Sequence, residues 1–182
     1  MEQHFSEIKQ AYDNFYRQLL GQGRLPVKDT GKGFWGASVS DEVFQSLKKI
    51  KAERFKTFFD LGAGDGKVVL IASLFGLKSR GLEIDKELVW HANRIKASLG
   101  HIPQLGNAEI IHGDYDGHHL GEYDLVYCNP DRPFHRGLDK KLAGEMKDEA
   151  LLLVYGFEYQ PNQLKKINSF NINGTHIGVF MK

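Results

Sequence analysis

The chain has one cysteine, Cys128, so no disulfide bond can form within it. Proteins of oxidising compartments often carry paired cysteines, and a lone thiol favours a reducing compartment. The first ten residues carry charges and lack the apolar stretch of a signal peptide. No apolar run approaches the roughly 18 residues that a membrane span needs. We therefore expect a cytoplasmic protein that does not enter a membrane.

The chain also lacks an excess of either charge. Its 24 lysine and arginine residues are balanced by 23 aspartate and glutamate residues, and the formal net charge is +1. No overall field therefore marks it as a nucleic-acid-binding protein, although a local basic patch remains open. Its 182 residues are enough for one domain with a substantial core.

Two amphipathic helices are predicted before the first strand of the main sheet. Apolar residues recur at helical spacing over residues 5–20. Residues 31–36 form a predicted loop of glycines and aromatic residues, and Ser40 has the position of an N-cap for a helix that ends near Ile50. We predict a helical extension over residues 1–33 and the main domain over residues 34–182.

From residue 57 onward, short apolar segments alternate with helical ones. Strands are predicted at 57–61, 80–84, 108–112, 123–127 and 150–157, and helices at 67–75, 86–98 and 138–146. This alternation implies parallel strands joined by right-handed crossovers. Near the end of the chain, Asn173-Gly174 separates two β-type segments, which is the pattern of a two-residue hairpin. The predicted fold is α/β, with a three-layer, mostly parallel sheet and a C-terminal antiparallel hairpin.

A glycine loop, DLGAGDG, follows the first of these strands at residues 60–66. Alternate glycines allow a sharp turn and close approach of a ligand to the backbone, beside a helix N-terminus. The loop is not a phosphate-binding P-loop, because its outer glycines are one residue too close and Val68 replaces the magnesium-binding hydroxyl. A dinucleotide fingerprint is weakened, because Lys67 replaces its third glycine. A tight turn without a ligand remains an alternative.

Acidic residues follow the next two strands. Glu83 ends the second strand, where a carboxylate can accept hydrogen bonds from both ribose hydroxyls of a nucleoside. Asp114 follows the third strand, where its carboxylate can accept from an adenine amino group, and Ile84 or Tyr115 can contact the adenine ring. The alternatives are a surface carboxylate at Glu83 and a simple Gly-Asp turn at Asp114.

The fourth strand leads into Cys128-Asn129-Pro130-Asp131-Arg132-Pro133-Phe134. Ligands of such sheets bind beyond the carboxyl ends of the strands. An Asn-Pro pair offers a side-chain oxygen and an unpaired backbone carbonyl, and both can accept a hydrogen bond from an N–H group that is to be methylated. We predict Asn129 and Pro130 as catalytic residues, with a proline-rich turn as the alternative.

The order of glycine loop, Glu83, Gly113-Asp114, Asn129-Pro130 and terminal hairpin resembles the class I S-adenosylmethionine-dependent methyltransferases over residues 34–182. The resemblance implies S-adenosylmethionine as cofactor and methyl transfer as reaction. It implies that Glu83 holds the ribose. It also implies that Gly62, Gly64 and Gly66 contact the methionine part of the cofactor and that Asp60 holds the amino group of that part. The residues that it places against the adenine are Asp114, Ile84 and Tyr115. No metal is predicted, because His118-His119 has no third ligand at a recognised spacing.

Within the class, the segment DLGAGDGKVVLIASLFGLKSRGLEIDKELV is most similar to the small archaeal and mitochondrial protein-lysine methyltransferases. These enzymes are related to the histone-lysine methyltransferases that lack a SET domain. Phe34-Trp35 and residues 156–159 fit this subgroup, whereas residues 129–134 resemble the Asn-Pro-Pro-aromatic loop of enzymes that methylate amino groups of nucleic-acid bases or glutamine.

We predict methyl transfer to an amino nitrogen of a protein lysine, with a nucleic-acid base as the alternative acceptor. The proton of the amine leaves to solvent or with help from Tyr127 or Tyr155. A nicotinamide-dependent oxidoreductase and a non-catalytic cofactor-binding subunit also remain open.

Overall fold

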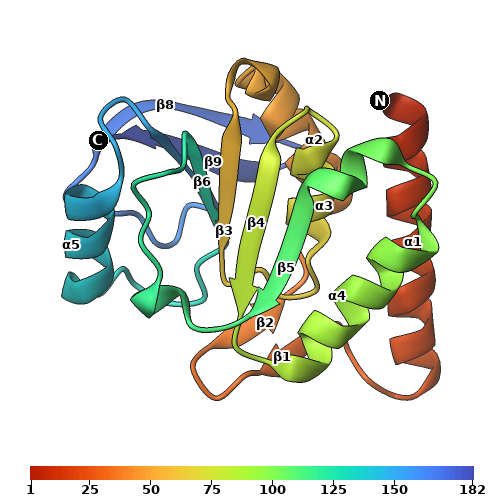
Figure 1. Ribbon diagram of the computed structural model, residues 1–182. Helices are drawn as coiled ribbons and strands as arrows, with labels where there is room; N and C mark the ends of the chain where they lie inside the picture. The colour runs from red at the N-terminus through yellow and green to blue at the C-terminus, as the bar shows by residue number, and fades with distance from the viewer.

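A computed structural model describes the backbone of all 182 residues and every side chain except that of Arg136. The chain forms a seven-stranded sheet in the order β5-β4-β3-β6-β7-β9-β8 (Figure 1). Its strands are β3 (Thr57–Leu61), β4 (Lys78–Glu83), β5 (Ala108–His112), β6 (Leu125–Cys128), β7 (Leu151–Tyr155), β8 (Lys165–Ile172) and β9 (Thr175–Met181). Strands β3 to β7 pair in parallel, and β9 pairs antiparallel with both β7 and β8. The predicted α/β fold with a C-terminal antiparallel hairpin is confirmed.

The terminal hairpin turns at the residues that the sequence indicated. Asn173 has a φ of 50° and Gly174 a φ of 91°, and a two-residue hairpin of the favoured hand needs positive φ at both positions. The turn therefore sets the register that pairs Ile172 with Thr175.

The two faces of the sheet carry separate hydrophobic clusters. Neighbouring residues of β3 alternate between them, Phe58 in one and Phe59 in the other, as the two-residue period of a strand requires. The cluster on the Phe58 face includes residues of α1 (Glu2–Gly21), α2 (Ser40–Lys49), α3 (Lys67–Ser73) and α4 (Lys86–Ser98). The cluster on the Phe59 face includes residues of α5 (Arg136–Glu145). Short 3-10 turns form η1 (Ala52–Arg54), η2 (Pro103–Asn107) and η3 (Tyr115–Gly117).

The N-terminal helix α1 shares its core with the sheet. Its apolar face is buried in the same cluster as α2 and α3, and the ring of Phe5 stacks on that of Phe44 with centroids 4.0 Å apart. Residues 1–33 therefore pack directly on residues 34–182, whichever boundary is drawn between them.

Two local predictions are wrong. The segment expected to be a loop, residues 31–36, contains β2 (Phe34–Gly36), which pairs antiparallel with β1 (Val27–Asp29) in a small hairpin. Asp29 stabilises its turn by accepting a hydrogen bond from the amide of Gly31, whose φ is +81°. Ser40 is the first residue of α2 and not its N-cap, because the helix begins one residue earlier than expected, after Val39.

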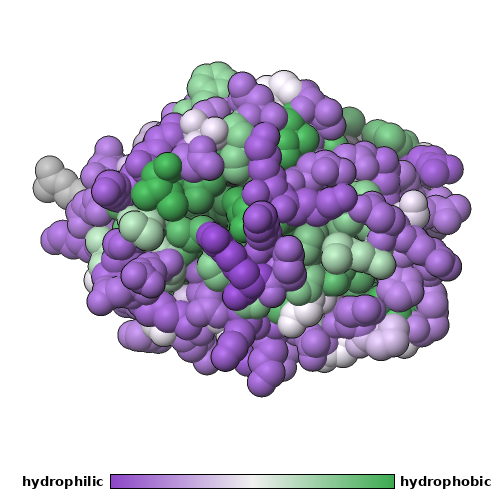
Figure 2. All heavy atoms as spheres, turned by 90° about the horizontal axis from the view of Figure 1, so that it is seen from above, coloured by the Kyte–Doolittle hydropathy of each residue, from purple (hydrophilic) through white to green (hydrophobic). Residues whose placement is uncertain are grey.

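The hairpin lies beyond the carboxyl ends of β4 and β5, at the lower end of the molecule in Figure 1. The opposite end, seen in Figure 2, carries mainly hydrophilic side chains with smaller apolar areas between them. Over the described residues, none of the helices combines the length and apolar character that crossing a membrane requires.

Candidate functional site

A cavity of about 420 Å³ opens beside the carboxyl ends of β3, β4 and β6. Strand order reverses between β3 and β6, which is where ligands bind in open α/β sheets. The volume lies in the range of roughly 300–1,000 Å³ that is typical of small-molecule sites. The predicted site residues that line it are Asp60, Gly62, Gly64, Glu83, Ile84, Asp114, Tyr115, Asn129 and Pro130.

Gly66 is the one predicted site residue that does not line the cavity. A Cβ atom at this position would lie 2.8 Å from the Cβ of Ala92 and 2.8 Å from Cγ1 of Ile110. Its φ of 76° also lies in the left-handed region. Gly66 is therefore required where α3 begins, for close packing of the loop against α4 and β5.

Gly64 faces the cavity and is held from two sides. Its amide donates a hydrogen bond of 2.8 Å to Oε2 of Glu83, and its φ is 54°. A Cβ atom here would lie 2.3 Å from Cδ1 of Trp35. The buried indole of Trp35 thus covers the loop from the hairpin side, and only glycine fits beneath it.

Glu83 is buried at the end of β4, and both of its carboxylate oxygens accept backbone hydrogen bonds. Oε2 accepts from Gly64, and Oε1 accepts from the amide of Asp85 at 2.8 Å. Burial raises the pKa of this carboxyl, while the backbone hydrogen bonds oppose that rise. Each oxygen keeps a second lone pair, so the carboxylate can also accept hydrogen bonds from a diol in the cavity.

Asp60 is a second buried carboxylate, at 3% exposure, near the end of β3. Burial raises its pKa well above the ordinary value, and the charges of Asp65 and Glu83 raise it further. Among the described residues, no side chain or amide donates to the Asp60 carboxylate. A buried carboxylate needs a partner, and a ligand with an ammonium group would supply one here.

Helix α1 supports the glycine loop from behind. The hydroxyl of Tyr12 donates to the carbonyl of Asp65 at 2.8 Å, and the hydroxyl of Tyr16 donates to Asp65 Oδ2 at 2.5 Å. The ammonium of Lys67 donates to the Tyr16 hydroxyl at 2.7 Å. These residues were not predicted as part of the site, because tyrosines at positions 12 and 16 fit the apolar stripe of an amphipathic helix.

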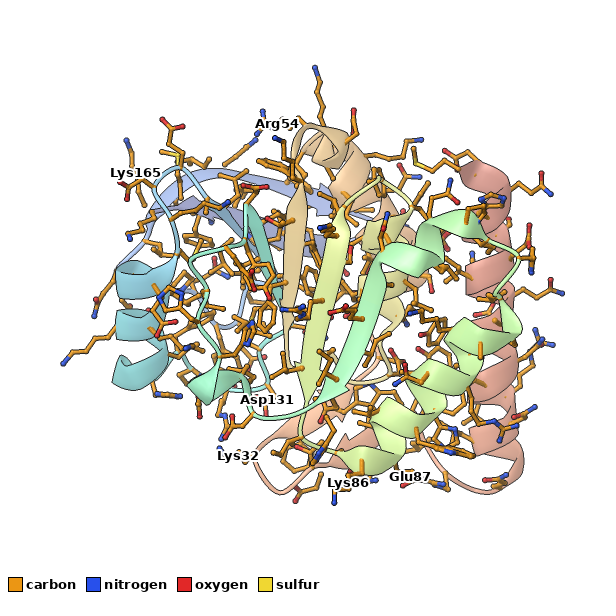
Figure 3. All side chains as sticks on the ribbon, in the orientation of Figure 1. Lys32, Arg54, Lys86, Glu87, Asp131 and Lys165 are labelled. Atoms are coloured by element: carbon orange, nitrogen blue, oxygen red, sulfur yellow. The ribbon has the colours of Figure 1, made fainter. Side chains whose placement is uncertain are left out.

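The β1–β2 hairpin closes the other side of the cavity through two polar contacts. The ammonium of Lys32 pairs with Asp114, and this pairing lowers the pKa of the Asp114 carboxyl. The amide of Phe34 donates to Asp131 Oδ2 at 2.7 Å. Figure 3 shows Lys32 and Asp131 at the same end of the molecule. Sequence reasoning missed these contacts, which join residues 82 and 97 positions apart.

The two residues expected beside an adenine ring both line the cavity. Ile84 is half-buried just after β4, and Tyr115 begins η3. Burial raises the pKa of Tyr115 to about 12, so its phenol is protonated at neutral pH. A Cβ atom at Gly62 would lie 3.8 Å from Cε1 of this ring, in ordinary contact.

Asn129 follows β6 and also lines the cavity. Its Nδ2 donates to the carbonyl of Gly36 at 3.3 Å and to Ser38 Oγ at 3.2 Å. Ser38 Oγ lies 3.1 Å from the hydroxyl of Tyr127. Ser38 was not predicted as a site residue, and no local pattern in the sequence distinguishes it from other serines.

The two phenols that were considered as helpers in proton removal are weak acids. Burial is the main cause of a raised pKa in both residues: the pKa of Tyr127 lies well above its ordinary value, and the pKa of Tyr155 is about 12. The Tyr155 hydroxyl donates a hydrogen bond to Glu42. Both phenols therefore stay protonated at neutral pH, which disfavours them as proton acceptors. In the described part of the chain, no group of three or more histidine, cysteine or acidic side chains is placed to hold a metal ion.

No protein-family model matches the chain. A protein-lysine N-methyltransferase from Saccharolobus islandicus is 27% identical over 141 residues, covering 73% of this chain and 84% of that protein. A ribosomal protein L11 methyltransferase from Caulobacter sp. is 30% identical over 130 residues, covering 63% of this chain and 43% of that protein. The chain thus spans less than half the length of the second relative.

Among solved structures, an RNA methyltransferase from Salinibacter ruber in complex with S-adenosyl-L-homocysteine superposes with a TM-score of 0.66. It is 18% identical, and the match covers 80% of this chain and 93% of that one. A mutant of MtNAS in complex with S-adenosylmethionine matches with a TM-score of 0.60 and 13% identity, over 77% of this chain and 62% of that one. These similarities establish a shared fold.

Proposed function

We propose that this S-adenosylmethionine-dependent methyltransferase transfers the methyl group to the amino nitrogen of a protein lysine. The observation that carries the choice of acceptor is the carboxylate of Asp131, which lines the cavity two residues after Asn129. This carboxylate accepts from the amide of Phe34 and lies 3.6 Å from Arg132 Nε, and it can also pair with an ammonium group, which a lysine carries and a nucleic-acid base does not. The similarity to an archaeal protein-lysine N-methyltransferase supports the same choice.

The chain's acceptor groups match the donors of S-adenosylmethionine along the cavity. In this proposal Asp60 holds the amino group of the methionine part, and the backbone at Gly62 and Gly64 lies against that part. Glu83 accepts from the ribose hydroxyls, which fits the free lone pairs left by its two backbone hydrogen bonds. Asp114 accepts from the adenine amino group.

The remaining adenine contacts come from Ile84 and Tyr115, which both line the cavity. An exposed ion pair with Lys32 occupies Asp114 in this structure, so the lysine has to share or release the carboxylate when adenine binds. Gly66 takes no part in cofactor contact in this proposal, because it packs against α4 and β5.

The cofactor supplies a methyl group that is already activated, so the chain's task is to place the acceptor nitrogen in line with it. We assign that task to Asn129 Oδ1 and to the backbone carbonyl of the Asn129-Pro130 segment. Asp131 draws the ammonium toward the cavity. The proton leaves to solvent, because Tyr127 and Tyr155 stay protonated.

A nucleic-acid base is the second candidate acceptor. Its support is the Asn129-Pro130 pair, whose acceptors suit a neutral amino group, together with Phe34, which is 66% exposed beside the cavity and can stack on a base. A base within a duplex would first have to be flipped out.

The deciding experiment is transfer of a tritiated methyl group from S-adenosylmethionine into cell extract, divided into protease-treated and nuclease-treated portions. We expect the label to be lost to protease and recovered as methyl-lysine after hydrolysis. Loss to nuclease would favour the second candidate. Cofactor binding without transfer to any fraction would indicate a non-catalytic subunit. We place the activity in the cytoplasm, on the ground of the single, buried Cys128.

A further inference from the structure

The side-chain amide of Asn129 is held by the end of β2 and by the segment that follows it. One contact is to the carbonyl oxygen of Gly36, at 3.3 Å. A carbonyl oxygen can only accept a hydrogen bond, so the amide atom that faces it is the nitrogen. The amide oxygen therefore occupies the other side of the group. None of the described residues donates a hydrogen bond to this oxygen, and Asn129 itself is exposed in the cavity lining.

The second contact of the amide nitrogen is Ser38 Oγ, at 3.2 Å. A serine hydroxyl has one proton and two acceptor sites, so it can accept from Asn129 and still share a hydrogen bond with the Tyr127 hydroxyl, 3.1 Å away. Tyr127 is 2% exposed in β6, and Ser38 is buried as well. The hydroxyl of Ser38 is thus held by a buried residue of β6 and in turn holds the amide.

We propose that Ser38 is a positioning residue, which keeps the oxygen of the Asn129 amide, and not its nitrogen, toward the methyl acceptor. The inference rests on the proposed function only in requiring an acceptor with an N–H group. Without the Ser38 hydroxyl, the amide keeps a single, long hydrogen bond to Gly36. Held by this one contact, the amide is free to turn about it, and its oxygen no longer stays directed at the N–H group of the acceptor.

The orientation can be tested without any acceptor, by nuclear magnetic resonance of the nitrogen-15-labelled full chain. The side-chain amide signal of Asn129 is assigned by its loss in Asn129→Ala. We expect Ser38→Ala to shift this signal and to speed exchange of its protons with water. The matched control is Ser73→Ala, since Ser73 is another buried serine whose hydroxyl donates to a carbonyl within α3, away from Asn129. An Asn129 signal unchanged by Ser38→Ala would overturn the inference.

The effect on the reaction is tested by a double-mutant cycle in single-turnover methyl transfer. The acceptor is the most strongly labelled macromolecule of the extract experiment, whether protein or nucleic acid. We expect Ser38→Ala to slow transfer about five-fold or more and Asn129→Ala about ten-fold or more. The double variant should be no slower than Asn129→Ala, because Ser38 acts through Asn129. If the fold-losses in rate of the two single variants multiply in the double variant, the two residues act independently and the positioning role is overturned.

Two further readouts separate a positioning role of Ser38 from general damage to the site and from a wrong acceptor. Affinity for S-adenosylhomocysteine, measured by calorimetry, should change less than about two-fold in Ser38→Ala, whereas a damaged cavity would bind it more weakly. Label on nucleic acid would overturn the lysine proposal alone, and the same cycle would then test Ser38 with that acceptor.

Discussion

The hydroxyl of Tyr16 lies between Asp65 and Lys67, donating to Asp65 Oδ2 at 2.5 Å and accepting from the Lys67 ammonium at 2.7 Å. Lys67 is 2% exposed, and its burial lowers the pKa of the ammonium. The rings of Tyr12 and Tyr16 lie 5.7 and 4.8 Å from this ammonium. Helix α1 therefore provides the immediate surroundings of a buried cation next to the glycine loop.

Removal of the Tyr16 hydroxyl should destabilise both the fold and the glycine loop. Tyr16→Phe keeps the ring but leaves the Asp65 carboxylate and the buried Lys67 ammonium each short of one partner. We expect the free energy of unfolding to fall by about 1–3 kcal/mol, the usual cost of losing such a partner for a charged or buried group. Urea denaturation measures it, with Tyr159→Phe as a tyrosine control outside α1. Equal stability of the two variants would show that the Tyr16 contacts contribute little.

Replacement of Glu83 should weaken cofactor binding. Glu83→Gln keeps the size of the side chain but turns an NH₂ group toward one of the two backbone amides that now donate to the carboxylate. We expect affinity for S-adenosylhomocysteine to fall by about 1.5–3 kcal/mol, or roughly 10- to 150-fold. Calorimetry measures this, with Glu109→Gln as the control, since Glu109 is an exposed residue of β5 paired with Arg80.

The same variant should also lower the melting temperature. A carboxylate at a strand end is expected from the sequence to add little to stability, but Glu83 is 5% exposed and joins Gly64 to Asp85. Unchanged affinity together with a lower melting temperature would make Glu83 structural and contradict its assignment to the ribose.

The gathering of four predicted site residues around one cavity could be predicted from the sequence. Asp60, Glu83, Asp114 and Asn129 each lie at or just beyond the end of a strand, and the alternation of strands and helices implied that those strands are parallel. Parallel strands bring their carboxyl ends to one edge of the sheet. Local patterns and one topological rule therefore sufficed to place four residues around one cavity.

The N-terminal side of the cavity could not be predicted in this way. Its contacts, Lys32 with Asp114 and Phe34 with Asp131, join segments that are far apart in the chain. No periodicity or spacing records such contacts, because they depend on where the hairpin docks. Tyr16 was hidden for another reason: its ring satisfies the apolar pattern of α1, and the function of its hydroxyl appears only once Asp65 lies beside it.

Asp60→Asn should make the protein more stable at neutral pH. The Asp60 carboxyl has a raised pKa in the folded state, whereas in the unfolded chain it titrates near about 3.9. Above that value the folded state binds more protons than the unfolded state, so stability falls as pH rises toward the folded pKa. Asparagine carries no charge, so the substitution removes the decrease in stability that ionisation of the buried Asp60 carboxyl causes.

We therefore expect Asp60→Asn to raise the melting temperature at pH 8 and to have a shrinking effect as pH falls toward about 4. It should also weaken S-adenosylhomocysteine binding about ten-fold, because a neutral amide holds an ammonium group less strongly. Thermal unfolding across this pH range checks the first part and calorimetry the second. A stabilisation that does not depend on pH would mean that the charge of Asp60 is not its cause.

Removal of Lys32 should strengthen cofactor binding slightly. Its ammonium pairs with the Asp114 carboxylate that we assign to the adenine amino group, so the two compete for one acceptor. The pair is exposed, with 53% of the Lys32 side chain and 35% of the Asp114 side chain accessible, and exposed ion pairs are weak. We expect Lys32→Ala to raise affinity for S-adenosylhomocysteine by less than about five-fold. Lys165→Ala, which removes a lysine at the opposite end of the molecule (Figure 3), should not change it.

Salt provides an independent check of this competition. Raising ionic strength screens an exposed ion pair, so salt should strengthen cofactor binding in the wild-type chain and reduce the difference between it and Lys32→Ala. If Lys32 instead helps to hold the bound cofactor, Lys32→Ala binds more weakly and the difference has the opposite sign at every salt concentration. The sign of one measured difference therefore decides whether Lys32 competes with the adenine for Asp114 or closes over it.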